Sequence, residues 1–581
     1  MNRFWSKRNL AYLSTTLFIL CLYSYPALHT GSTTGYWRLP ATSAPDLGLY
    51  LSLSSLNHDA QGAIQDPYYH QSVPASSVGF LKFRLGPQLY DVVTRMVGDR
   101  MGLGMFVWNL FWWTFLCLVA VWLFSELGSD VPATLIVAGV SILMLWNFAA
   151  FRPLVLAWRH FPSPSGFVWA QLPYIRPFFP QMAVALVLCY VALQIRALTS
   201  ERLAAWAAMA MVQFVAFAAF PYAMLLMAGT TAVAAIWYVR SSVPAHRWRR
   251  VLVYGLLCAG IDAAFLLWGP SGFRTGSPDR ASLIHFQLSL LPLMISRSWL
   301  LIGILVLAAT VSRKAAPGVR WTIVGMGLSN MILLLGDSVV SETAVMLSDH
   351  SGYFIHSTIT TLLVFLAAVH LFPDRRAKLA RIACIAATGI CLVTGLLVAE
   401  ATYRNNLPFN REQADIGAWL GRGEVRQGDL IISNLDACEW VPLLSNAEVL
   451  YCRTAQCLLT PEQNQQVQRY REVLYLYLAG RDRAWIESTT DLARYGFYYE
   501  QFLKGDRART LAAARGEILS IYRNLERGDP AAREFFGRYN RIWIVENVDR
   551  PVFSGARITS YLKTGNPQRI GNLEILPASA K

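Results

Sequence analysis

The chain has 581 residues, of which 54% are hydrophobic and only 15% are charged, and its mean hydropathy is +0.36. Soluble globular proteins carry about 25% charged residues, so this composition excludes an ordinary soluble enzyme. The net charge of +15 would suggest a nucleic-acid partner in a soluble chain. Here the basic residues gather between long apolar runs, which is typical of membrane topology, and no nucleic-acid partner is predicted.

Apolar runs follow one another up to about residue 400, most of them about 18 to 23 residues long and therefore able to cross roughly 30 Å of hydrocarbon. About eleven runs stand out, at 10–29, 105–127, 132–151, 181–198, 203–221, 222–239, 251–269, 298–312, 321–337, 353–372 and 380–400. The sequence therefore predicts a polytopic α-helical membrane bundle over residues 1–400, with about eleven transmembrane helices.

Charge between the runs predicts the orientation of the bundle. With the N-terminus placed inside, sixteen Lys and Arg residues fall in short inner segments and six in short outer loops. Because basic residues favour cytoplasmic loops, the N-terminus is predicted to be cytoplasmic and residues 401–581 extracytoplasmic, which means periplasmic in a bacterium. The first run is long, and we expect it to be an uncleaved signal anchor.

The segment at 30–104 is predicted to be a long first outer loop with two helices lying on the membrane surface. Both "LGLYLSLSSL" and "VGFLKFRLGPQLYDVVTRMVG" place apolar residues on one face and polar residues on the other. The dipeptide Gly86-Pro87 is expected to break the second helix midway.

Residues 401–581 read as a separate soluble α/β domain. A helix at 412–422 is followed by predicted strands at 429–433, 448–452, 541–548 and 573–578, with a mostly helical insertion at 461–537. Strands that alternate with helices favour a layered domain with a largely parallel sheet. No GxGxxG motif follows a strand and no P-loop is present, so no nucleotide cofactor is predicted.

Three cysteines, Cys438, Cys452 and Cys457, lie in this predicted outer domain. An oxidising compartment favours one disulfide, either Cys438–Cys452 or Cys452–Cys457, with one thiol left over. No Cys or His spacing indicates a metal site. No cofactor is therefore predicted, and a divalent metal is left open.

A single carboxylate, Asp46, begins the first amphipathic segment about sixteen residues after the first apolar run. One interpretation is a helix N-cap, since Asp accepts hydrogen bonds from free backbone N–H groups at a helix start. The other is a general base at the membrane–water boundary that takes a proton from an incoming hydroxyl group. Most histidines and acids of the bundle region fall on the predicted outer side, which is where an active site would open.

The opening "PDLGLYLSL" resembles the first outer loop of the GT-C membrane glycosyltransferases, where an acid is followed four residues later by Tyr, here Asp46 and Tyr50. The cytoplasmic N-terminus, the long first outer loop and the outer C-terminal domain are similar to that superfamily over the whole chain. Many members have a second acid beside the first, and this chain has Leu47 there.

The resemblance implies transfer of a sugar from a polyprenyl-phosphate carrier to a glycan, lipid or protein acceptor outside, with Asp46 as the base. Tyr50 would contact substrate. Guanidinium groups suit the phosphate leaving group because they bind two of its oxygens at once. Arg84 and Arg159 are the best-placed candidates, and each also suits the role of an ordinary anchor at the membrane interface.

An acid inside the bilayer, Asp262, is costly unless it is paired or hydrated, so it is a candidate for lining a substrate cavity. Alternatively, Asp262 pairs with a residue of a neighbouring helix and does not contact substrate.

Two other functions remain open. A transporter or flippase of a lipid-linked saccharide is disfavoured because no half-repeat is detectable and only one clear acid lies within the membrane. A non-catalytic envelope assembly protein would tolerate replacement of Asp46.

Overall fold

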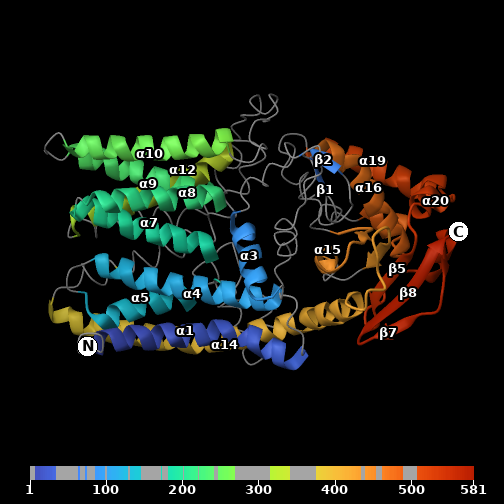
Figure 1. The fold of residues 1–581 in the computed structure, drawn as a ribbon, viewed down its shortest axis with the longest axis horizontal. Helices are drawn as coiled ribbons and strands as arrows, with labels where there is room; N and C mark the ends of the chain where they lie inside the picture. Colours follow the sequence, from blue (N-terminus) through green and yellow to red (C-terminus); the bar gives the residue numbers. More distant parts are fainter. Residues whose placement is uncertain are drawn as a thin grey trace.

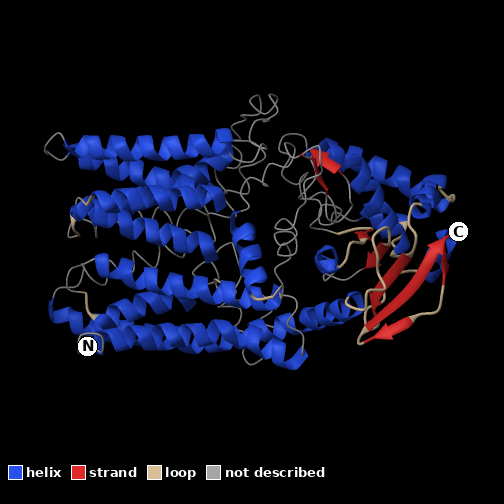
Figure 2. Ribbon diagram, viewed as in Figure 1, coloured by secondary structure: helices blue, strands red, loops and turns tan. Residues whose placement is uncertain are grey.

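The computed structural model describes residues 7–34, 63–65, 72–74, 85–98, 101–127, 131–145, 172, 174, 181–200, 202–219, 221–240, 246–268, 315–339, 365, 374–433, 439–452, 461–488 and 507–581. Long helices make up a bundle at one end of the molecule, and the larger sheet with its helices lies at the other end (Figures 1 and 2). A short antiparallel pair, β1 (Ala63–Gln65) and β2 (Ser72–Pro74), falls within the predicted first outer loop.

One half of the bundle consists of α1 (Lys7–Thr34), α4 (Met101–Glu126), α5 (Ala133–Leu145) and the first part of α14 (Asp374–Leu420). The other half consists of α7 (Gln181–Ser200), α8 (Leu203–Ala219), α9 (Pro221–Arg240), α10 (His246–Trp268) and α12 (Pro317–Val339). Contacts between α4 and α7 join the two halves, and the helices run side by side in Figure 1.

These nine helices coincide with nine of the predicted apolar runs. The runs at 298–312 and 353–372 lie outside the described residues, except for Phe365. Among the described helices, α1, α4, α7 and the Ile385–Arg404 section of α14 are long and apolar enough to cross a membrane, and α5 and α8 are apolar but shorter. The chain is accordingly an integral membrane protein.

Hydrogen bonds between buried side chains join the helices of the second half. The Tyr190 hydroxyl lies 2.5 Å from the Tyr254 hydroxyl, which in turn donates to Gln213 Oε1 at 2.6 Å. Thr231 donates to Gln194 Oε1 at 2.7 Å. Such bonds replace the hydrophobic effect as a source of helix–helix affinity in a membrane, because lipid is as apolar as the helix surfaces.

Glycine brings α9 and α12 close together. A Cβ atom added at Gly325 would lie 2.5 Å from the Thr230 carbonyl oxygen, and one at Gly229 would lie 2.6 Å from Ser329 Oγ. We expect Gly325→Val to destabilise the protein by about 1–3 kcal/mol, since the two backbones would have to move apart. Thermal unfolding of the detergent-purified chain, followed by circular dichroism, measures this loss.

Gly255→Val on α10 is the matched control, because a Cβ atom there meets nothing within 4 Å. Both substitutions place a β-branched residue in a helix, so their costs in helix propensity are similar. Equal losses for the two variants would contradict the close packing of α9 against α12.

The helix α3 (Leu85–Met96) runs across the end of the bundle, at a steep angle to the other helices (Figure 1). Its Tyr90 side is buried, whereas Leu89, Val92 and Met96 are exposed. An exposed apolar face at this place fits the predicted membrane-surface helix. The described helix includes Gly86 and Pro87, and the residues before Leu85, on the other side of the predicted break, lie outside the described part, so this break stays a prediction.

The sheet of the C-terminal part has six strands in the order β4-β3-β5-β8-β6, with β7 also paired to β8. The strands are β3 (Leu430–Ser433), β4 (Glu448–Val449), β5 (Ile542–Asn547), β6 (Leu562–Thr564), β7 (Gln568–Ile570) and β8 (Leu573–Ala580). Four of them, β3, β4, β5 and β8, lie at the predicted positions.

The prediction of a largely parallel sheet is wrong. The strands β4, β3 and β5 are parallel, but β8 is antiparallel to β5, β6 and β7. The chain between β5 and β8 contains only one short helix, α21 (Gly555–Tyr561), and it returns alongside β5 instead of crossing over the sheet. A parallel return usually needs a longer helical crossover.

Helices cover both faces of the sheet. Leu430, Ile432, Ile542 and Ile544 pack in one core with α16 (Pro461–Leu478), α19 (Arg507–Glu526) and α20 (Pro530–Gly537). Side chains one residue along, such as Ile431 and Val545, belong to the core that holds Trp419 of α14. This alternation follows from the period of two in a strand. The short helices α15 (Val441–Leu444) and α17 (Arg483–Ser488) complete the described helices of this part.

The helix α14 connects the bundle to the sheet without interruption. Its 47 residues pass through the change in hydropathy at 400 and 401, so that change marks a difference in surroundings rather than the end of a helix. At its far end, Glu412 accepts a hydrogen bond from Asn547 Nδ2 at 2.6 Å and forms an ion pair with Arg550. Asp415 accepts from the Asn572 N–H at 3.1 Å, which fixes α14 to the turn before β8.

Candidate functional site

Four of the predicted site residues, Asp46, Tyr50, Arg84 and Arg159, lie outside the described residues. The fifth, Asp262, lies on α10, and the structure describes its place along the helix but not its side chain. The roles of these five residues therefore stay predictions.

The helices before and after the predicted first outer loop show where that loop begins and ends. The helix α1 ends at Thr34, before Asp46, and α3 begins at Leu85, directly after Arg84. The Tyr90 hydroxyl donates to the Met101 carbonyl oxygen at 2.6 Å, which holds α3 against the start of α4. The chain therefore leaves α1 and enters α3 at the end of the bundle that faces the C-terminal part (Figure 1).

A cluster of polar and aromatic side chains joins α1 to α14 near the same end; we call Tyr25, His29, Glu400, Tyr403 and Arg404 the α1–α14 cluster. The Tyr25 hydroxyl donates to Glu400 Oε2 at 2.6 Å, and Arg404 Nε donates to Glu400 Oε1 at 2.5 Å. The His29 ring lies 5.4 Å from the Tyr25 ring and 4.2 Å from the Tyr403 ring, measured between centroids.

Helix geometry assembles this cluster from two short patterns. Tyr25 and His29 are four residues apart on α1, while Glu400, Tyr403 and Arg404 have the i, i+3, i+4 spacing on α14, so each set lies on one face of its helix. The Glu400–Arg404 pair is solvent-exposed on both side chains and contributes only about 0.3–0.5 kcal/mol. The pair therefore adds little to the stability of the protein.

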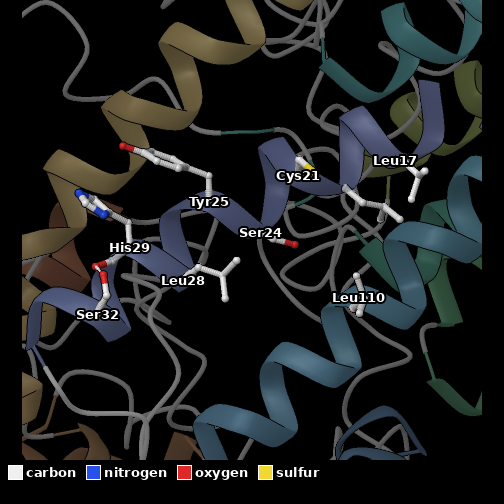
Figure 3. A pocket seen from close by; sticks show the side chains of 9 residues that line it. Leu17, Cys21, Ser24, Tyr25, Leu28, His29, Ser32 and Leu110 are labelled. Atoms are coloured by element: carbon white, nitrogen blue, oxygen red, sulfur yellow. Dashed lines mark hydrogen bonds between the residues drawn. The ribbon is translucent and has the colours of Figure 1, made fainter. Parts of the chain in front are cut away.

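A pocket of about 530 Å³ runs along α1 beside this cluster (Figure 3). Its lining consists of Leu17, Leu20, Cys21, Ser24, Tyr25, Leu28, His29 and Ser32 from α1 and Leu110 from α4. In the close view, Tyr25 and His29 point toward α14, whereas Leu110 comes from α4 on the other side of α1. The volume lies within the range of about 300–1,000 Å³ that is usual for small-molecule sites.

The lining changes character along α1. The stretch from Leu17 to Cys21 is apolar, and hydroxyl, phenol and imidazole groups appear only from Ser24 to Ser32. The pocket is therefore mostly apolar, with a few polar groups toward Ser32. Within the part of the chain that the structure describes, no group of three His, Cys, Asp or Glu side chains is placed to hold a metal ion.

Tyr25, Glu400 and Arg404 were not among the predicted site residues, and His29 is one of the histidines on the predicted outer side. The local signal that could have indicated these residues is their four-residue spacing, which places Tyr25 and His29, and likewise Glu400 and Arg404, on one face of a helix. The contact itself joins residues 375 positions apart, and no local pattern encodes such a contact. Of the predicted cysteine pairs, the structure describes only buried Cys452, so the disulfide stays a prediction.

No protein-family model and no curated protein sequence matches the chain. Among solved structures it is similar to the arabinofuranosyltransferase AftD from Mycobacteria, with 13% identity and a TM-score of 0.44 over 98% of this chain and 40% of that chain. It is also similar to the oligosaccharyltransferase AglB from Archaeoglobus fulgidus, which was solved with an inhibitory peptide and a dolichol-phosphate. That match has 11% identity and a TM-score of 0.34 over 94% of this chain and 70% of that chain. This chain thus spans about two fifths of the length of AftD.

Proposed function

We propose that this protein is a GT-C-type membrane glycosyltransferase that moves a sugar from a polyprenyl-phosphate carrier to a cell-envelope acceptor. The observation that carries the proposal is the pocket along α1, which is mostly apolar and has phenol, imidazole and hydroxyl groups only toward Ser32. A lipid-linked sugar has the same division between an apolar chain and a polar head. The Ser32 end of the pocket lies near the end of α1. That end of the helix bundle faces the C-terminal part (Figure 1).

The proposed orientation places the N-terminus in the cytoplasm and the active site on the outer face. The Tyr25–Glu400 hydrogen bond supports a shared compartment for the first loop and the C-terminal part. Because this bond joins α1 and α14 near one end of the bundle, we expect the loop after Thr34 and the C-terminal part to share one side of the membrane. The basic residues between the predicted spans favour the opposite side as cytoplasmic.

In the proposed reaction, Asp46 accepts the proton of the acceptor hydroxyl as that oxygen attacks the anomeric carbon of the sugar. The bond from this carbon to the phosphate oxygen breaks, and polyprenyl phosphate leaves with the electron pair. Arg84 and Arg159 would bind the growing phosphate charge, while Tyr50 and Asp262 would contact substrate. Groups fixed in place before the reaction stabilise such charge more effectively than water does.

Purified protein in lipid vesicles, incubated with a panel of radiolabelled polyprenyl-phosphate sugars and a cell-envelope extract, tests this function. We expect label to move from the carrier to a component of the extract with at least one donor. Movement of labelled donor across the vesicle membrane without transfer would instead show a transporter. Absence of transfer and movement with every donor would contradict both functions and favour an assembly protein.

A further inference from the structure

Basic side chains gather at the end of the bundle that lies away from the C-terminal part, which is the end with the N-terminus in Figure 1. At this end α9 stops at Arg240, α10 starts at His246 and α12 starts at Pro317. We give the name basic rim to four arginines and two tryptophans at these helix ends, Trp237, Arg240, Arg247, Arg249, Arg320 and Trp321. Residues 202–261 and 281–336 contain no Asp or Glu, so these segments do not balance the positive charge of the rim themselves.

Aromatic rings join the three helix ends of the basic rim. Trp237 of α9 and Trp321 of α12 are stacked, with 6.1 Å between ring centroids and 17° between ring planes. The guanidinium carbon of Arg320 lies 5.5 Å from the Trp321 ring centroid. That of Arg247 on α10 lies 4.8 Å from the ring centroid of Tyr238 on α9. A ring that covers the face of a guanidinium group leaves the N–H groups at the edge of that group directed outward, where they can bind two oxygens of a phosphate.

Three arginines of the basic rim have no acidic partner among the residues that the structure describes. None of the described carboxylates forms an ion pair with Arg240, Arg249 or Arg320, and the first two of these arginines are exposed. In contrast, Arg196 on α7, at the same end of the bundle, lies 3.5 Å from Glu126 of α4. A group of arginines without a counter-charge attracts anions from its surroundings, and at the surface of a membrane these anions are the phosphate groups of lipids.

Exposed apolar side chains lie one turn further into the bundle than the arginines. Ile236 is four residues from Arg240 on α9, and Val253 is four residues from Arg249 on α10, so each pair lies on one face of its helix. Ile236 and Val253 are 58% and 52% exposed, and Leu256, about one turn beyond Val253, is 63% exposed. A free phosphate ion would leave this apolar surface uncovered. A phospholipid covers both parts, since its headgroup reaches the arginines while its acyl chains lie against the apolar side chains.

We propose that the basic rim binds the headgroup of an anionic phospholipid, whose acyl chains lie along the exposed faces of α9 and α10. The bound lipid holds the ends of α9, α10 and α12 at one membrane surface, on the side predicted to be cytoplasmic. A headgroup with a net negative charge binds there more tightly than a zwitterionic headgroup on the same acyl chains. The site lies at the opposite end of the bundle from α3, so it is separate from the proposed sugar transfer and does not depend on it.

Native mass spectrometry of the full chain in detergent tests this site, because it counts the lipids that stay bound to the protein. The probe is an equimolar mixture of phosphatidylglycerol and phosphatidylcholine with identical acyl chains. We expect the wild type to retain phosphatidylglycerol preferentially. Each basic side chain near a membrane surface strengthens the binding of an anionic lipid about fivefold, so Arg249→Gln/Arg320→Gln should lower the ratio of bound phosphatidylglycerol to phosphatidylcholine about 5- to 25-fold.

Lys7→Gln/Arg8→Gln is the matched control, because it removes the same charge from the exposed start of α1 at the same end of the bundle. We expect this variant to keep the wild-type ratio. Equal retention of the two lipids by the wild type, a comparison that needs no variant, would overturn the proposal. Equal losses in the two double variants would overturn it as well, since they would show a general attraction to positive charge. Displacement of phosphatidylglycerol by inorganic phosphate would mean that the rim is a site for free anions and not for a lipid.

Discussion

An Asp46→Asn variant is expected to transfer sugar about 10²–10⁴-fold more slowly than the wild type, which is the usual contribution of general base catalysis. Asparagine keeps the size and the hydrogen-bonding oxygen of the side chain but cannot take up the proton of the acceptor hydroxyl. If Asp46 acts only in the transition state, kcat falls and KM for the donor changes little. Initial rates with a radiolabelled donor over a range of concentrations separate these two effects.

The control for this experiment is Asp91→Asn. Asp91 lies on α3, at the same end of the bundle, and forms an ion pair with Arg95 one turn away at 2.8 Å. Its loss removes one carboxylate from this end of the protein without touching the proposed base, so transfer should stay close to the wild-type rate. Full activity of Asp46→Asn would end the assignment of a base and return Asp46 to the role of a helix N-cap. A loss in both variants would point to a general effect of charge.

The sequence was most informative where one local signal decides the structure. The apolar runs that correspond to α1, α4 and α7 predict helices, because a chain that crosses hydrocarbon has to satisfy its backbone hydrogen bonds within itself. The short apolar runs around Ile431 and Ile544 likewise predict β3 and β5 by composition and length. These assignments need no knowledge of the rest of the chain.

Strand direction was missed because it depends on the path of the chain between strands. Between β5 and β8 the chain forms α21, β6 and β7 in close succession, and their pairing with β8 makes the return antiparallel. Periodicity reports which side of a strand is buried, and it does not report which neighbour the strand meets. The same limit hid the uninterrupted course of α14, since hydropathy follows the surroundings of a helix and not its hydrogen bonds.

The candidate site was found from the sequence only in part, because its described members meet across the length of the chain. Tyr25 looks ordinary within its apolar run, and Glu400 stands at the end of its own run, where a charged residue is common. They acquire a common role only when α1 packs beside α14. Asp46, in contrast, was noticed because a single acid in an apolar segment is locally unusual. Long-range contacts thus build the α1–α14 cluster, whereas a locally unusual residue suggested the proposed base.

Loss of Arg471 is expected to destabilise the C-terminal part by about 3 kcal/mol, since removing one partner of a buried ion pair leaves the other without compensation. Arg471 lies on α16 with 5% of its side chain exposed, and it donates to Glu448 Oε2 at 2.9 Å and to the Val449 carbonyl oxygen at 3.1 Å. Burial raises the pKa of Tyr539, so its hydroxyl keeps its proton and donates to the same Glu448 oxygen at 2.8 Å. This one hydrogen bond cannot replace the lost cation.

The measurement for Arg471→Met is the temperature at which a protease cleaves half of the C-terminal part in the full-length protein. A loss of this size lowers that temperature by about 6–12 °C for a unit of 150–250 residues. Arg538→Met is the matched control, because Arg538 and its partner Glu534 are 65% and 72% exposed and such pairs contribute about 0–1 kcal/mol. If both variants melt at the same temperature, pairing with β3 and apolar packing suffice to hold β4, and the buried ion pair between α16 and β4 has no net role in stability.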